Sequence, residues 1–113
     1  MKLVNISGSS ITITRGDTLD ALLEITCLDG SAYRPKSGDV IRFALKQRYS
    51  DREPLLTKVI PNATLNLRLE AEETKMLKAG GVPYVYDIQI TMEDGTVDTF
   101  IDRGRLTVTE EVD

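Results

Sequence analysis

The sequence predicts an all-β fold, an antiparallel sandwich of about seven to nine strands that forms a single domain over residues 1–113. Three observations support this fold class. Apolar and polar residues alternate along most of the chain, as expected of strands that bury one face. Turn signals rich in Gly, Pro, Asp and Asn recur at intervals typical of short strands. Only residues 71–78 replace the alternation with a helical pattern.

Composition agrees with one globular domain and disfavours some classes of partner. Hydrophobic residues make up 41% of the 113 residues and charged residues 28%, close to the average for folded domains. The net charge of -4 disfavours nucleic acid as a partner, because such binding needs a basic surface. No apolar run is long enough to cross a bilayer, and the N-terminal segment lacks a signal-peptide pattern. We therefore expect synthesis in the cytoplasm and no insertion into a membrane.

The first half of the chain predicts four strands. The first two cover residues 11–14 and 19–27, with the lone Cys27 on the buried face of the second. After a loop over residues 28–39, a strand is expected at residues 41–46, and a charged connection then leads to a strand over residues 55–60. This last strand carries one charged residue, Lys58. Either it pairs with another subunit as an exposed edge, or the preceding charged loop covers it.

The second half begins with the clearest alternation, in which Leu65, Leu67 and Leu69 face inward. The helix expected over residues 71–78 has acidic residues early and lysines late, as the helix dipole favours, and Gly80 or Gly81 is its expected end.

The next strand buries alternate residues, which suits a place near the middle of a sheet. These residues are Tyr84, Tyr86, Ile88, Ile90 and Met92.

The last strands form a hairpin. Asp94-Gly95 predicts its tight turn, because these residues readily adopt positive φ angles. Two returning strands are expected, over residues 97–102 and 105–109. A bulge or sharp bend at Arg103-Gly104 separates them.

Two tyrosines favour an immunoglobulin-like arrangement of the sandwich. In such folds the hydroxyl of a corner tyrosine bonds back to the chain upstream, two residues before a core position that holds a cysteine in antibody domains. Tyr84 matches the corner residue and Tyr86 the core position. Cys27 lies on the strand that would hold the other cysteine. Because Tyr86 occupies the partner position, this disulfide is absent, as a cytosolic protein would require.

The residues offer little for catalysis, so we expect a protein that is not an enzyme and binds no cofactor. The chain has no histidine, which removes the commonest general base and transition-metal ligand. Cys27 is expected to be inert in the core. Neither a glycine-rich phosphate loop nor a calcium loop is recognisable. Tyr33 and Tyr49, in polar loops, are candidate contact anchors, unless each ring folds onto its own strand.

The order of motifs resembles the immunoglobulin-like domain of prophage and tailed-phage structural proteins, such as the N-terminal domain of baseplate upper proteins. Five segments carry the resemblance: residues 13–18, 67–77, 80–88, 94–97 and 104–108. The resemblance implies a noncatalytic assembly module that docks other phage structural proteins and forms a homo-oligomer in the particle. The protein would then occupy the bacterial cytoplasm during assembly and the virion afterwards.

The alternative is a stand-alone binding module for a carbohydrate or protein on a cell surface. Such a module usually presents a row of exposed aromatic side chains. Aromatic residues make up only 5% of this chain, and tryptophan is absent, which disfavours a carbohydrate platform.

Overall fold

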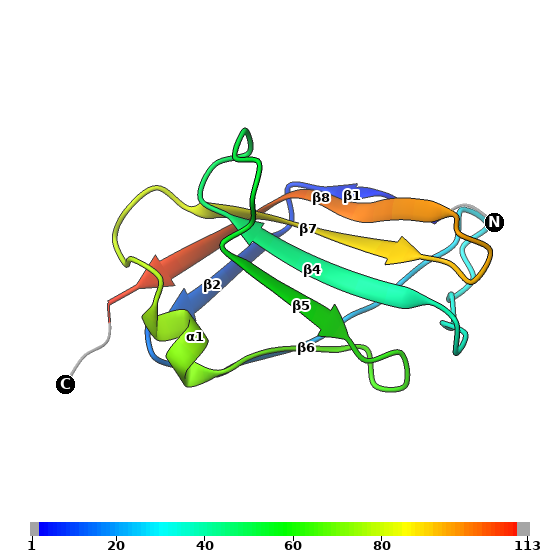
Figure 1. Cartoon of the computed structure of the whole chain (residues 1–113), viewed down its shortest axis with the longest axis horizontal. Helices are drawn as coiled ribbons and strands as arrows, with labels where there is room; N and C mark the ends of the chain where they lie inside the picture. Colours follow the sequence, from blue (N-terminus) through cyan, green and yellow to red (C-terminus); the bar gives the residue numbers. More distant parts are fainter. Residues whose placement is uncertain (1–2, 111–113) are drawn as a thin grey trace.

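The computed structural model describes residues 3–110, and its fold is all-β with one short helix, as predicted (Figure 1). Residues 1–2 and 111–113 of the predicted domain lie outside the described residues. The eight strands and the helix of the described chain are, in order, β1 (Ile6–Ser7), β2 (Ser10–Thr14), β3 (Leu19–Leu22), β4 (Val40–Lys46), β5 (Leu56–Ile60), β6 (Asn66–Leu69), α1 (Ala71–Lys75), β7 (Tyr84–Thr91) and β8 (Val97–Thr109).

The strands form two sheets with immunoglobulin-like connections. The larger sheet has the order β1-β8-β7-β4-β5, with β2 also paired to β8, and the smaller sheet consists of β3 and β6. In the standard description of the fold, β3 and β6 take the places of strands B and E, and β4, β7 and β8 take those of C, F and G. The extra strand β5 extends the larger sheet, as strand C′ does in variable-type domains.

The sheet is mixed, which corrects the antiparallel prediction. Both β1 and β2 run parallel to β8, with Ile11 opposite Leu106 and Ile13 opposite Val108. The alternation of apolar residues is the same in parallel and antiparallel strands, so it carries no direction. A hairpin would set the direction, but almost the whole chain separates β2 from β8.

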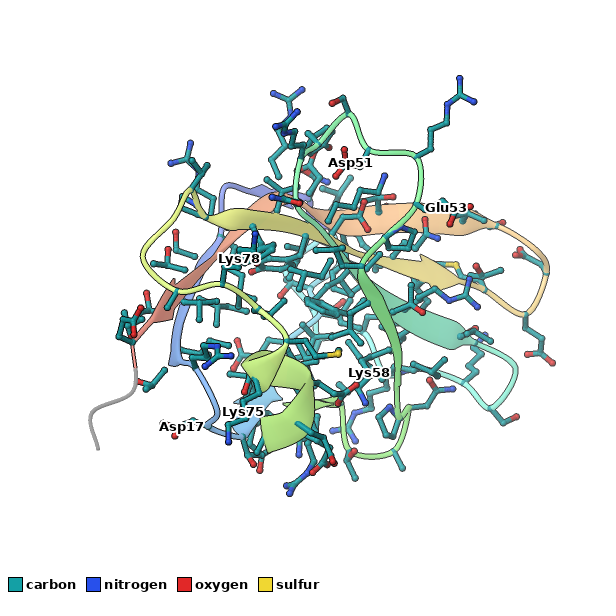
Figure 2. The ribbon with its side chains drawn as sticks, turned by 60° about the vertical axis from the view of Figure 1, so that its left-hand side comes forward. Asp17, Asp51, Glu53, Lys58, Lys75 and Lys78 are labelled. Atoms are coloured by element: carbon teal, nitrogen blue, oxygen red, sulfur yellow. The ribbon has the colours of Figure 1, made fainter. Side chains whose placement is uncertain are left out.

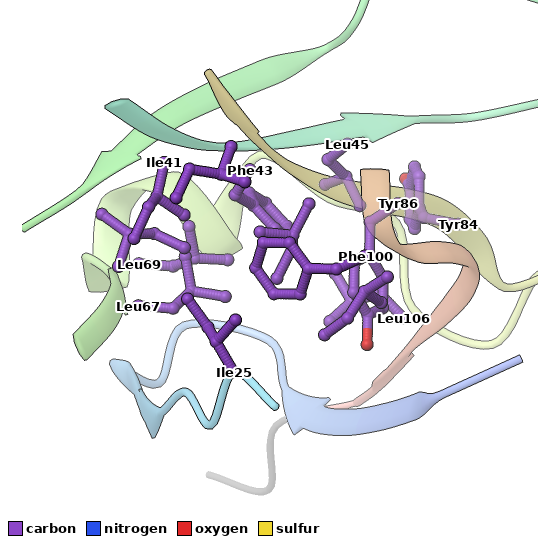
Figure 3. Packing of buried hydrophobic residues seen from close by; sticks show 14 of the residues in the cluster. Ile25, Ile41, Phe43, Leu45, Leu67, Leu69, Tyr84, Tyr86, Phe100 and Leu106 are labelled. Atoms are coloured by element: carbon purple, nitrogen blue, oxygen red, sulfur yellow. The ribbon is translucent and has the colours of Figure 1, made fainter. Parts of the chain in front are cut away.

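The core lies between the sheets and takes side chains from both (Figure 3). Phe43 and Tyr86 meet at its centre with their ring centroids 5.4 Å apart. Burial of each large apolar side chain stabilises the fold by roughly 1.5–3 kcal/mol. The largest fully buried apolar side chains are Phe43, Phe100, Ile41, Leu45, Ile60, Leu69, Ile88, Ile90 and Leu106.

Strand β3 is shorter than the strand predicted over residues 19–27. It ends at Leu22, although burial alternates as predicted as far as Cys27. The Leu23 amide still donates to the Leu65 carbonyl (2.8 Å), next to β6, but Thr26 and Cys27 then form isolated bridges with Ala32 and Leu3. Cys27 therefore lies outside β3, because the backbone leaves β6 while its side chains still face the core.

The two predicted C-terminal strands are one strand, β8, with the predicted bulge inside it. Arg103 has a φ of 53°, and the register with β7 shifts after Tyr86. Gly104 lies opposite Tyr86, and a Cβ atom at this position would come within 2.4 Å of the Tyr86 ring. The glycine therefore makes room for the buried ring.

Helix α1 is shorter than the predicted 71–78, since it ends at Lys75 with Met76 as its C-cap. The Lys78 amide donates to the Tyr84 hydroxyl and the Gly80 amide to the Val108 carbonyl, so neither is free to extend the helix. Gly80 has the positive φ expected of a helix stop, 75°, but lies in the connection to β7. The buried Thr74 hydroxyl donates to the Asp17 carbonyl (2.7 Å) and so ties α1 to the turn before β3.

The hairpin between β7 and β8 forms at the predicted residues. The Met92 amide donates to the Thr96 carbonyl (2.7 Å), and Gly95 has a φ of 92°. The Asp94 carboxylate accepts a hydrogen bond from the Thr96 amide (2.9 Å), which closes the turn. The hairpin lies at one end of the long axis of the molecule, opposite the connection between α1 and β7 (Figure 1).

Candidate functional site

Three surfaces are candidates for function: the two ends of the sandwich and the free edge of the larger sheet. The loop end consists of residues 28–39, 61–65 and 92–96, and the corner end consists of residues 47–54 and 76–83 (Figure 1). Each contains residues that the sequence marks as structural or as contact anchors, so their geometry decides what they can do.

The corner end contains the hydrogen bond predicted for the corner tyrosine. Tyr84 is 7% exposed, and its hydroxyl accepts the Lys78 amide at 2.8 Å. Tyr86 fills the core position two residues later, and its hydroxyl lies 3.4 Å from the Ser9 carbonyl oxygen, to which it donates. Tyr84 therefore holds the adjoining connection from α1 against β7, and Tyr86 holds the distant segment before β2. Cys27 is also buried, so its thiol is screened from solvent.

The loop end is held together by the buried carboxylate of Asp39. Its Oδ2 accepts hydrogen bonds from the Tyr33 hydroxyl and the Lys36 amide (2.9 Å), and its Oδ1 accepts the Glu93 amide (3.1 Å). Asn62 donates to the Asp39 carbonyl at 2.7 Å. Burial alone would raise the pKa of Asp39, but these hydrogen bonds lower it below its ordinary value. The ionised side chain thus ties the loop before β4 to the hairpin, and the Asp39 carbonyl adds the loop that contains Asn62.

Tyr33 belongs to this network. This position agrees better with a ring folded onto its own strand than with a free contact anchor. Its ring is half-buried, and its hydroxyl donates to Asp39. Burial, aided by this hydrogen bond and the Asp39 charge, raises the pKa of Tyr33 to about 12. Tyr33 and Asp94 line a shallow hollow of about 400 Å³. The structure therefore brings together two residues that the sequence places 61 positions apart.

Tyr49 is the exposed aromatic residue of the two. Its side chain is 54% exposed in the loop between β4 and β5, and the Arg103 guanidinium carbon lies 5.6 Å from the ring centroid. A cation at this distance is attracted by the face of the ring. Tyr33 precedes β4 and Tyr49 follows it, so the two rings lie at opposite ends of that strand and form no shared platform.

Side chains that could hold a metal ion do not cluster in residues 3–110. These residues contain no group of three or more Asp, Glu, Cys or His side chains that could hold a metal ion. In the same part of the chain, no helix has the length and apolar character needed to cross a membrane. Burial raises the pKa of Asp87, with a further contribution from Asp102, while Lys46 opposes the shift.

The free edge of the larger sheet is strand β5, which has no strand on its outer side among the described residues. Leu55 and Val59 are 53% and 64% exposed, so the charged loop before β5 does not cover them. Lys58 lies on β5 (Figure 2), opposite Phe43. Its ammonium group forms an ion pair with Glu73 at 2.8 Å. An inward-pointing lysine is a common protection of an edge strand against indiscriminate pairing.

No family model matches the chain, and no curated protein matches its sequence.

Proposed function

We propose that this protein is a noncatalytic assembly module of a phage or prophage particle, a component of its baseplate, tail, neck or head. In this role it docks other virion subunits and forms a homo-oligomer in the particle. The motif resemblance supports the class of particle. The observation that carries the docking role is the uncovered edge of β5, with Leu55 and Val59 exposed beside it.

An edge strand can add a strand from another chain, because its outward backbone groups are available for pairing. The exposed Val59 then gives the partner an apolar contact. Lys58 limits uncontrolled self-association, since an approaching strand meets a charge at the margin of the core. Its ion pair with Glu73 is partly exposed and therefore worth at most about 1 kcal/mol, so a specific partner can rearrange it at small cost.

The test is association with the products of neighbouring genes, measured by co-purification and light scattering. The wild-type chain should form a stable complex or a defined oligomer, and Val59→Glu should weaken it by at least about tenfold. Val97→Glu is the matched control, because Val97 is similarly exposed but lies at the hairpin, away from β5. A strictly monomeric wild-type chain with no affinity for these proteins would contradict the proposal.

The alternative function, binding a carbohydrate or protein on a cell surface, is favoured by one observation, the exposed Tyr49 ring beside Arg103. A glycan array would test the carbohydrate form of this alternative. Binding that is lost in Tyr49→Ala would support it over the assembly role. Tyr33→Ala is a weaker probe, because it also breaks the hydrogen bond to Asp39.

A further inference from the structure

The corner end contains a small hollow that two basic residues line. It has a volume of about 220 Å³ and lies between the loop after β4 and the connection from α1 to β7. Sites for drug-sized ligands usually measure roughly 300–1,000 Å³, so this hollow has room for a single side chain rather than a cofactor. Its lining residues are Gln47, Arg48, Lys78, Gly81, Val82 and Tyr84.

The buried member of the lining is Tyr84, whose hydroxyl is only half used. It accepts the Lys78 amide at 2.8 Å, and nothing in the described part of the chain accepts its proton. The hydroxyl therefore retains a donor beside the hollow. A ligand that accepts this proton therefore gains a hydrogen bond from a group that the Lys78 amide already holds in place.

Two basic residues, Arg48 and Lys78, line the same hollow. In residues 3–110, neither the Arg48 guanidinium nor the Lys78 ammonium group has an ion-pair partner. The nearest acidic group in the same loop, Asp51, accepts a hydrogen bond from the Arg48 amide at 3.1 Å, so one of its oxygens is directed to the backbone. The hollow thus offers positive charge and hydrogen-bond donors without a matching internal acceptor.

We propose that this hollow binds a carboxylate carried by an acidic segment of a partner protein. A planar carboxylate suits a guanidinium group together with further donors. Val82 is 88% exposed at the rim and gives a polypeptide an apolar contact. A nucleic acid fits less well, because the exposed apolar Val82 suits a polypeptide side chain better than a polar sugar-phosphate backbone. The inference deepens the proposed function by naming the chemistry of its partner.

The test uses the isolated full chain and a short blocked peptide of Glu and Val residues, followed by nuclear magnetic resonance titration. Peptide binding should shift the amide signals of residues 47–48 and 78–84 and weaken as ionic strength rises. The same peptide with Gln in place of Glu should bind at least about tenfold more weakly. Equal binding of the Gln peptide would overturn the proposal. So would tighter binding of inorganic phosphate or a short oligonucleotide.

Variants locate the binding in this hollow. The double substitution Arg48→Gln and Lys78→Gln should weaken the Glu peptide at least about tenfold. Lys75→Gln is the control, because Lys75 is also exposed near this end but does not line the hollow. Gly81→Glu should block peptide binding by supplying an internal carboxylate, since a Cβ at this position meets no atom within 4 Å. Unchanged affinity in the double variant would refute the site.

The experiments can refute either proposal without refuting the other. Loss of virion-protein association only in Val59→Glu, with no peptide binding to the isolated chain, would support docking at β5 and overturn the carboxylate site. Peptide binding without association with any neighbouring gene product would support the hollow and contradict the assembly role.

Discussion

The two ends of the sandwich use their buried polar side chains in opposite ways. At the loop end, the Asp39 carboxylate accepts three hydrogen bonds, from Tyr33, Lys36 and Glu93. At the corner end, Tyr84 accepts one hydrogen bond from Lys78 and keeps its proton unpaired among the described residues. At the loop end, the buried carboxylate has its donors within the protein. At the corner end, the Tyr84 proton, Arg48 and Lys78 have no acceptor or ion-pair partner among the described residues.

The difference separates a structural role from a binding role. A buried carboxylate that has its donors in place stabilises the loops that supply them and gains little from a ligand. A donor that is buried and unpaired gains from a ligand that accepts its proton. Burial of a polar side chain is therefore not by itself a sign of function. Whether the hydrogen-bonding capacity is complete is the more informative observation.

The largest expected effect is at the loop end. Asp39→Ala leaves the Tyr33 hydroxyl and two backbone amides without their acceptor, and should reduce the free energy of unfolding by about 3–5 kcal/mol. Denaturant unfolding measures this loss. Asp29→Ala is the control, because Asp29 accepts its bonds from Ser31 at an exposed turn and should cost less than about 1 kcal/mol.

The effect of Asp39 should also depend on pH in a defined direction. Because its pKa is lowered in the folded state, ionised Asp39 stabilises the fold above the ordinary pKa of 3.8, and this stabilisation is lost as pH falls through the lowered value. The difference in unfolding free energy between the wild type and Asp39→Ala should therefore become smaller in acid. A difference that widens as pH falls below 3.8 would contradict the assigned network.

An intermediate effect is expected at the corner end. Tyr84→Phe removes the acceptor of the Lys78 amide but keeps the buried ring, and should cost about 1–2 kcal/mol in thermal or denaturant unfolding. Tyr49→Phe, which changes an exposed hydroxyl, should leave stability unchanged within about 0.5 kcal/mol. If Tyr84→Phe cost as much as Asp39→Ala, the contrast between the two ends would not hold.

The smallest effect concerns Asp87, a half-buried carboxylate that receives none of the donors that Asp39 has. Its pKa is raised by burial and by Asp102, so ionised Asp87 disfavours the fold. This penalty is absent below the ordinary pKa of 3.8 and appears as pH rises through the raised value. Asp87→Asn should stabilise the protein by about 0.5 kcal/mol at neutral pH and by nothing in strong acid, measured by thermal unfolding. A destabilised variant at neutral pH would refute this assignment.

Much of the fold was predictable because its signals are local. The Asp94-Gly95 hairpin, the bulge at Arg103-Gly104 and the corner bond of Tyr84 each depend on a few residues with special backbone or side-chain geometry. The edge position of β5 was one of two alternatives, and the exposed Val59 shows that the loop leaves it uncovered. The Asp39 network was missed. Its local signal, an Asp three residues after Lys36 in a turn, does not reveal the distant Glu93 and Tyr33 donors.

The sequence by itself determined which residues face the core, where the chain turns and that a histidine-dependent chemistry is excluded, because these properties follow from composition and periodicity. Tertiary structure alone decided the parallel direction of β1 and β2, the early ends of β3 and α1, and the presence of Arg48 and Tyr84 in the lining of one hollow. These features depend on hydrogen bonds and charges from segments far apart in the chain. Local patterns carry no record of which distant donor meets which acceptor.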